Sequence, residues 1–189
     1  MGEVIGRAGT SLSGRASWAA NAGTIRAGGL GEKMTQSVLA DLAKRTDVTV
    51  LHDVRVPIPG MSINIDHVVV AGDKVLLIDS KCWEPGFYWS HGQTTRRGLT
   101  SCPHHRKQTV AMAHKAFTSF LGPRARLVQP IVVVWPSRVR GKVSVWAATF
   151  PGATLVLGHR LDRAARRSLP VRRVADPMIV AALRSLVIV

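Results

Sequence analysis

Residues 62–81 read SINIDHVVVAGDKVLLIDSK, and this stretch decides the fold. Two runs of β-branched and aliphatic residues flank the dipeptide Gly72-Asp73, which is a favoured two-residue hairpin turn. The pattern therefore predicts two antiparallel strands, Ser62 to Val70 and Lys74 to Lys81. With Gly72-Asp73 as the turn, Ala71 pairs with Lys74.

This register places Asp66 directly opposite Asp79. Directly opposed side chains leave the same face with Cβ atoms about 5 Å apart, and Lys81 emerges on that face too because strand side chains alternate. Opposed like charges destabilise a sheet, and both strands are otherwise apolar, so the carboxylates need a compensating cation. Carboxylate oxygens select Mg²⁺ or Mn²⁺. With an ammonium beside the ion, the hairpin carries the groups that metal-assisted phosphodiester hydrolysis requires.

Two interpretations without catalysis stay open at this point. Asp66 and Asp79 could be solvent-facing residues of a sheet. A salt bridge from Asp79 to Lys81 could also satisfy the acid without any metal ion.

Composition and charge narrow the class of protein. The chain has 189 residues, a formal net charge of +15 and two cysteines, and its sequence pI is about 11.5. A hydrophobic content of 46% argues against a wholly disordered basic protein, and two cysteines argue against a disulfide scaffold. No apolar run reaches the roughly 18 residues of a membrane span. Charge alone favours nucleic acid as the partner and leaves an anionic membrane surface or a ribosomal-type protein open. Together with the missing span, it leads us to expect a cytoplasmic domain that binds nucleic acid and not a membrane.

The order of elements predicts a mixed α/β fold. Residues 1–29 are rich in Gly, Ala, Ser and Thr and are expected to form a flexible basic arm. The expected helices and strands after the arm are a helix over Leu30–Arg45, strands over Val48–Val56, Ser62–Val70 and Lys74–Lys81, a helix over Pro103–Leu121 and a strand over Leu127–Trp135. This α-β-β-β-α-β order indicates a mixed sheet flanked by helices. Residues 30–161 form the expected core, and residues 162–189 a helical extension packed on it.

Four short segments resemble one known family. They are Gly31-Glu32 at the start of a helix, Ile65-Asp66-His67-Val68-Val69-Val70, Leu77-Ile78-Asp79-Ser80-Lys81, and Gln108 on a helix after a proline. Together they resemble the nuclease-related domain (NERD) family of the PD-(D/E)xK restriction-endonuclease-like superfamily. The resemblance covers about residues 30–161 and implies a mixed β-sheet flanked by helices with a divalent-metal site at one edge.

The resemblance also implies roles for individual residues. Asp66 and Asp79 would bind Mg²⁺ or Mn²⁺, with the Ser80 carbonyl and Glu32 as further ligands. Lys81 would orient or activate the attacking water, and Gln108 would position the substrate or a metal-bound water. Asp79 stands where many superfamily members have Glu, which shortens the reach to the metal.

Arginines outside these segments are candidates for contacts with nucleic acid. Arg96 and Arg97 lie in an aromatic-rich segment, and Arg160, Arg163 and Arg167 share one helical face. We expect them to bind backbone phosphate without reading sequence. Ordinary surface charge, or a basic surface that docks on a partner protein, is the alternative.

These observations predict a metal-dependent nuclease that hydrolyses DNA phosphodiester bonds. The alternative is a non-catalytic nucleic-acid-binding or nucleoprotein assembly module on the same fold. A homo-oligomer or a larger nucleoprotein assembly is compatible with either hypothesis.

Overall fold

A computed structural model describes residues 2–9, 22–92, 94–102, 108–138 and 140–188, without the side chains of 22–28. A mixed sheet has the strand order β1-β2-β3-β4-β9-β11, with β8 paired to one end of β4. Its strands are β1 (Glu3–Ile5), β2 (Thr49–Arg55), β3 (Asn64–Ala71), β4 (Lys74–Trp83), β8 (Arg126–Leu127), β9 (Ile131–Pro136) and β11 (Thr154–Leu157). A second sheet has the order β10-β5-β6-β7 and consists of β5 (Gly86–His91), β6 (Thr94–Arg97), β7 (Thr100–Ser101) and β10 (Val143–Ala147).

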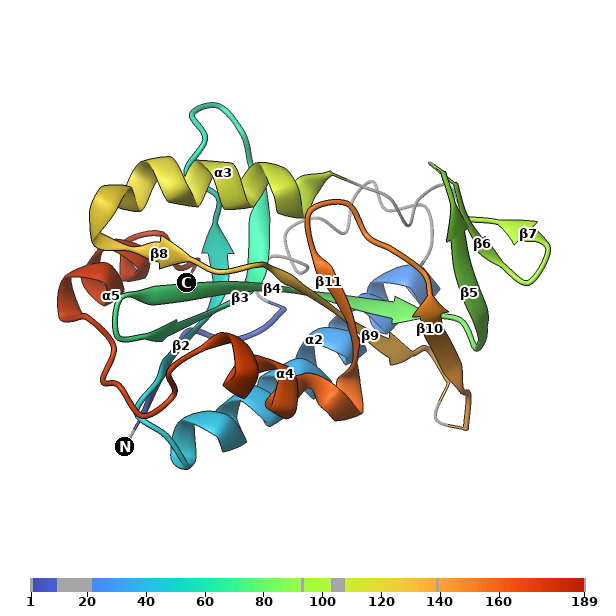
Figure 1. Cartoon of the computed structure of the whole chain (residues 1–189), viewed down its shortest axis with the longest axis horizontal. Helices are drawn as coiled ribbons and strands as arrows, with labels where there is room; N and C mark the ends of the chain where they lie inside the picture. Colours follow the sequence, from blue (N-terminus) through green and yellow to red (C-terminus); the bar gives the residue numbers. More distant parts are fainter. Residues whose placement is uncertain (1, 10–21, 93, 103–107, 139, 189) are drawn as a thin grey trace.

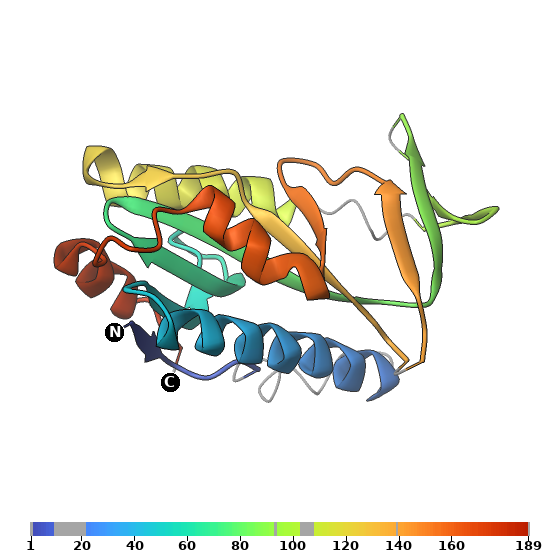
Figure 2. The same cartoon turned by 60° about the horizontal axis from the view of Figure 1, so that its bottom comes forward.

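Helices cover both faces of the larger sheet. They are α2 (Ala22–Lys44), α3 (Thr109–Leu121), α4 (Leu161–Ser168) and α5 (Pro177–Arg184), with short 3-10 turns η2 (Gly122–Arg124) and η3 (Gly158–Arg160). Side chains of α2 and α4 share one hydrophobic cluster with the sheet, and side chains of α3 and α5 share another. Figures 1 and 2 show α2 and α4 on one side of the sheet and α3 on the other. The succession α2-β2-β3-β4-α3-β9 confirms the predicted mixed α/β core.

The predicted hairpin forms in the predicted register. Ala71 pairs with Lys74, and the ladder continues to His67 opposite Ile78. Gly72 occupies the turn with φ of +58°, a conformation that favours glycine. Beyond His67 and Ile78 the ladder between β3 and β4 ends, while β4 continues alongside β9 as far as Trp83. The ladder between the two strands therefore ends next to Asp66 and Asp79.

The N-terminal segment differs from the expected flexible arm. Glu3–Ile5 pairs in parallel with β2, and α2 begins at Ala22 rather than at Leu30. The glycines at 23, 28 and 29 argue against a helix by propensity, but they lie in one that is anchored further along by buried Leu39 and Leu42. The part of the expected arm at residues 10–21 lies outside the described residues.

Two other boundaries also shift. Helix α3 begins at Thr109 instead of Pro103, and residues 103–107 lie outside the described residues. The expected strand over Leu127–Trp135 divides into β8 and β9, because Pro130 interrupts the ladder between them. The segment after Trp83 forms the small sheet, which projects from the body beside β10 (Figure 1).

Candidate active site

Two strands and one helix bring the predicted acidic residues together. Asp66 comes from β3, Asp79 and Lys81 from β4, and Glu32 from α2, whose Gly31 lies against the backbone of Lys81 and the side chain of Cys82. A Cβ at Gly31 would stand 3.7 Å from Cys82 and Lys81 atoms, so the helix passes close to β4 here. This close approach places Glu32 near the end of the hairpin.

Asp66 is fixed by the backbone of β4. Its Oδ2 accepts a hydrogen bond from the Ser80 amide, with 2.6 Å between oxygen and nitrogen. Burial, and then the charge of Asp79, raises the pKa of Asp66 well above its ordinary value. Asp79 therefore lies close enough for its charge to disfavour ionisation of Asp66, in agreement with the hairpin register.

Asp79 forms an ion pair with Lys81. The Lys81 Nζ lies 2.5 Å from Asp79 Oδ2, and this buried oxygen has no other hydrogen-bond donor among the described residues. Burial alone would lower the pKa of Lys81, but the charges of Asp79 and Asp66 outweigh burial, so the pKa lies above its ordinary value. The salt bridge that the sequence left open as a non-catalytic alternative is therefore present.

Glu32 is the third carboxylate of the cluster. Burial, followed by the charge of Asp53, raises the pKa of Glu32 to about 7, although Lys81 and a hydrogen bond from the Gly9 backbone act in the opposite direction. The carboxyl group is thus close to half-protonated near neutral pH. Gly9 belongs to the N-terminal segment, so that segment contributes directly to the site.

Asp53 is a member of the cluster that the sequence did not indicate. His52 pairs with His67 and Val54 with Ile65, so the register sets Asp53 of β2 opposite Asp66. Asp53 is buried, and among the described residues it is the only non-glycine residue with positive φ, at +55°. Such strain persists where the surroundings over-determine a conformation, and it is frequent at functional sites. Adjacent strands thus carry Asp53, Asp66 and Asp79 in one row across the sheet.

A buried chain of hydrogen bonds lies under the cluster. His52 Nδ1 and His67 Nδ1 are 2.7 Å apart, and His67 Nε2 lies 3.1 Å from Ser80 Oγ. The Ser80 hydroxyl donates to Thr35 Oγ1 at 2.9 Å, and Thr35 donates to the Gly31 carbonyl at 3.0 Å. Because Ser80 separates Asp79 from Lys81, this chain ties the site segment of β4 to α2 and β3.

The other predicted site residues lie apart from the acids or are already paired. Gln108 is exposed at the N-terminal end of α3 and makes no hydrogen bond to the acids within the described chain. Arg97 forms an ion pair with Glu84, and Arg96 lies over the Trp89 ring at 5.8 Å. Arg160, Arg163 and Arg167 are exposed on η3 and α4. The roles expected for these six residues stay predictions.

The acids suit Mg²⁺ or Mn²⁺ by chemistry, because their donors are carboxylate oxygens, and the buried Asp79 Oδ2 has Lys81 as its ion-pair partner but no further hydrogen-bond donor among the described residues. In the described residues no group of three or more His, Cys, Asp or Glu side chains is already arranged to hold an ion. Binding would therefore require Glu32, Asp66 and Asp79 to converge and Lys81 to leave Asp79.

Comparisons with known proteins agree with the predicted family and fold. A family model described as the nuclease-related domain, NERD, matches residues 27–135, which is more than half of the chain and includes Glu32, Asp66, Asp79 and Lys81. No curated protein and no solved structure matches the chain. None of the helices in the described residues is both long enough and apolar enough to cross a membrane.

Proposed function

Because the chain belongs to the nuclease-related domain family, we propose that it is a Mg²⁺- or Mn²⁺-dependent nuclease that hydrolyses DNA phosphodiester bonds. One observation carries the proposal: where the β3–β4 ladder ends, the charges of Asp79 and its neighbours act on Glu32, Asp66 and Lys81, and the pKa of each of these three groups is raised. A formal net charge of +15 supports a polyanionic substrate.

The residues divide into ligands and proton-handling groups. Asp66 and Asp79 would hold the ion, with Glu32 and the Ser80 carbonyl as candidates for completing its shell. The bound ion would supply Lewis-acid activation of the phosphate and stabilise its developing negative charge. Lys81, which neutralises Asp79 in this structure, would donate a hydrogen bond to a non-bridging phosphate oxygen when Asp79 serves as a ligand.

Hydrolysis adds water across one P–O bond. The water oxygen bonds to phosphorus, the bond to the leaving sugar oxygen breaks, one proton leaves the attacking water and one proton from solvent reaches the leaving oxygen. Where Glu32 does not complete the shell of the ion, it is suited to accept the water proton, because a pKa of about 7 makes it a base near neutral pH. Lys81 would orient that water or hold the phosphate.

The test is cleavage of supercoiled plasmid and linear duplex DNA with Mg²⁺, with Mn²⁺ and with EDTA. Asp79→Asn and Lys81→Ala should each lower the rate about 100-fold or more. Asp73→Asn and Lys74→Ala make the same chemical changes at the turn end of the same hairpin, and they should leave the rate unchanged. Wild type that cuts neither substrate with either ion, or site variants that cut as fast as the controls, would refute the proposal.

A second candidate function is a nucleic-acid-binding module without turnover. The observation that favours it is that Lys81 already neutralises Asp79, while no preformed group of three ligands exists in the described residues. Isothermal titration of Mg²⁺ and Mn²⁺ separates the two functions. Heat that disappears in Asp66→Ala supports the nuclease, whereas no heat together with DNA binding that survives chelation supports the module.

A further inference from the structure

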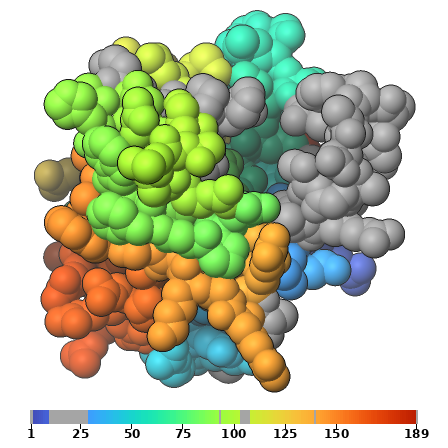
Figure 3. Space-filling model, turned by 90° about the vertical axis from the view of Figure 1, so that its right-hand side faces the viewer, coloured from blue at the N-terminus to red at the C-terminus, as the bar shows by residue number. Residues whose placement is uncertain are grey.

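A groove of about 1060 Å³ lies between β10, β11 and α4, and we call it the α4 groove. Its described lining contains no acidic residue. Three arginines and five uncharged polar side chains line it together with apolar residues, and the polar set is Arg160, Arg163, Arg167, Gln129, Ser144, Thr149, Thr154 and Ser168. Figure 3 views the face on which β10 (orange) and α4 (red-orange) lie side by side. The α4 groove is therefore a cationic surface without compensating acids.

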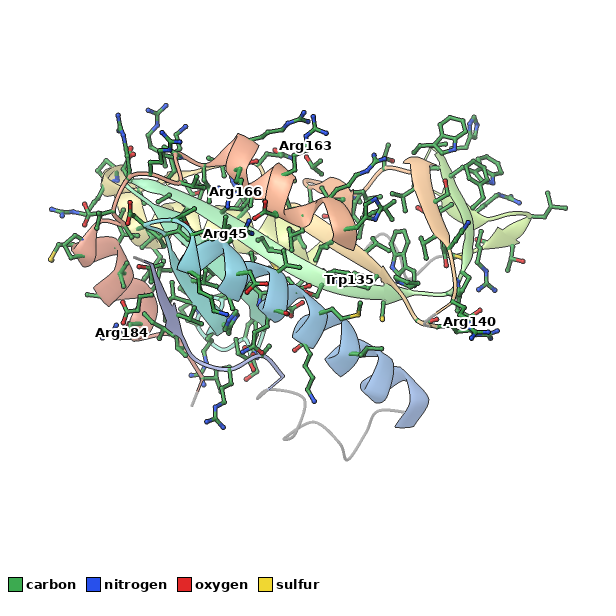
Figure 4. The ribbon with its side chains drawn as sticks, turned by 90° about the horizontal axis from the view of Figure 1, so that it is seen from below. Arg45, Trp135, Arg140, Arg163, Arg166 and Arg184 are labelled. Atoms are coloured by element: carbon green, nitrogen blue, oxygen red, sulfur yellow. The ribbon has the colours of Figure 1, made fainter. Side chains whose placement is uncertain are left out.

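The three groove arginines have no ion-pair partner in the described part of the chain. The one acid of α4, Asp162, is already shared by Arg45 at 3.1 Å and Arg166 at 3.0 Å. In Figure 4, Arg166 and Arg45 lie close together, whereas Arg163 extends away from the body of the molecule. Like charges three and four residues apart on a helix repel one another. A bound polyanion would relieve that repulsion.

An exposed aromatic residue stands on the opposite wall. Trp146 of β10 lines the groove with 83% of its surface exposed, and its ring contacts Phe87 at a centroid distance of 5.5 Å. Tryptophan is usually well buried. An aromatic face beside a cationic track is the arrangement that proteins use for unpaired bases, because any base can stack on it. Paired bases in a duplex do not present that face.

The groove adjoins the acidic cluster across the sheet. Asp79 pairs with Val132 of β9, and Val132 pairs with Leu155 of β11, which lines the groove. Two strand spacings separate the backbones of Asp79 and Leu155, or roughly 10 Å. A polynucleotide strand in the groove would therefore reach the cluster within a few nucleotides.

We propose that the α4 groove binds single-stranded nucleic acid, with Arg160, Arg163 and Arg167 contacting backbone phosphates and Trp146 stacking on a base. The role of this strand in cleavage rests on the proposed function, but its binding does not require any metal ion or turnover. The groove would hold an unpaired strand leading from the site where the phosphodiester bond is cut.

The experiment is fluorescence anisotropy in EDTA with three labelled probes: oligo-dT, oligo-U and a blunt duplex hairpin. We expect the single strands to bind more tightly than the duplex. Equal binding of oligo-dT and oligo-U supports phosphate and stacking contacts alone, and a preference for one identifies the natural strand as DNA or RNA. A duplex that binds as tightly as the single strands overturns the proposal.

Variants test the two kinds of contact separately. The double variant Arg163→Glu/Arg167→Glu should weaken oligo-dT binding at least 10-fold and lower the slope of log K against log salt by about 1.4. The control Arg140→Glu/Arg172→Glu makes the same change in net charge at exposed positions outside the groove, and its effect should be much smaller. Equal losses in the two double variants would show that net charge alone binds the strand, against the proposal.

Trp146→Ala should weaken oligo-dT binding about 5- to 100-fold without changing the salt slope, and Trp146→Phe should retain most of the affinity. Leu99→Ala, at another highly exposed apolar residue, is the matched control and should have no effect. Unchanged binding by Trp146→Ala, or a groove variant that alters the oligomeric state in light scattering instead of binding, overturns the proposal. Asp79→Asn should bind oligo-dT as wild type does. A loss of cleavage can therefore be distinguished from a loss of binding in the groove.

Discussion

The carboxylate of Asp66 lies 2.6 Å from the backbone nitrogen of Ser80 and accepts its hydrogen bond. The bond holds β3 to β4 at the point where their ladder has ended. Asp66 therefore has a structural role in addition to its proposed role as a metal ligand. Substitutions of different size separate the two roles.

Asp66→Asn keeps a side-chain oxygen that can accept the hydrogen bond from the Ser80 amide. It removes the negative charge that is repelled by Asp79. We expect its unfolding free energy to stay within about 1 kcal/mol of wild type, while Asp66→Ala leaves the Ser80 amide unsatisfied and costs about 1–3 kcal/mol. Urea denaturation in EDTA measures both values. Equal destabilisation by the two variants would show that the charge, and not the hydrogen bond, sets the contribution of Asp66.

The charge of Asp53 is a cause of the raised pKa of Glu32. Asp53→Asn should lower the pKa of Glu32 below its wild-type value of about 7, and asparagine also tolerates the positive φ at this position. Carboxyl ¹³C NMR can follow this titration, because the chain has three glutamates, Glu3, Glu32 and Glu84. Asp41→Asn, which removes an exposed carboxylate further along α2, is the control. An unchanged titration in Asp53→Asn would place Asp53 outside the cluster.

The hairpin was predictable from sequence because its geometry is local. A two-residue turn fixes the register of both strands, so the opposition of Asp66 and Asp79 followed from Gly72-Asp73 alone. Asp53 lies one strand further away, and the connection between β2 and β3 is too long to specify a register. Once the structure gives the register between β2 and β3, counting along the paired strands places Asp53 opposite Asp66.

The chain of buried hydrogen bonds beneath the site and the start of α2 could not be predicted from sequence, because both depend on tertiary packing. Thr35, Ser80 and His67 belong to three different elements, and no sequence spacing joins them. His67 follows Asp66 on β3 and faces the other side of the sheet, where it lies within hydrogen-bonding distance of His52 and Ser80. Helix α2 includes residues of low helix propensity because the remainder of the helix packs on the sheet.

The two buried histidines should make the protein less stable in acid. Burial lowers the pKa of His52 from 6.5 to about 4, and burial together with His52 lowers the pKa of His67 well below its ordinary value. The unfolded chain therefore binds more protons than the folded one between pH 6.5 and 4, so stability is fully present above 6.5 and falls as pH decreases. For His52 alone the loss approaches about 3 kcal/mol at the lower end of this range.

Urea denaturation across this pH range, for wild type and for His52→Gln, measures the effect. The difference between the two profiles isolates His52 from the carboxyl groups, whose raised pKa values favour the folded state in acid. His159→Gln, at an exposed histidine on η3, should follow wild type. Parallel profiles for wild type and His52→Gln would contradict the assignment of this acid sensitivity to His52.

Thr35 joins α2 to two strands through one hydroxyl group. Its Oγ1 accepts from Ser80 Oγ and from Trp135 Nε1 at 2.8 Å, and it is completely buried. Thr35→Val preserves the shape but leaves the Trp135 and Ser80 donors unsatisfied, which should cost about 2–4 kcal/mol for the two groups. Thr35→Ser keeps the hydroxyl and loses a methyl group, so about 1 kcal/mol is expected. Urea denaturation gives both values. A valine variant as stable as the serine variant would mean that this hydroxyl does not hold Glu32 and its helix against β4.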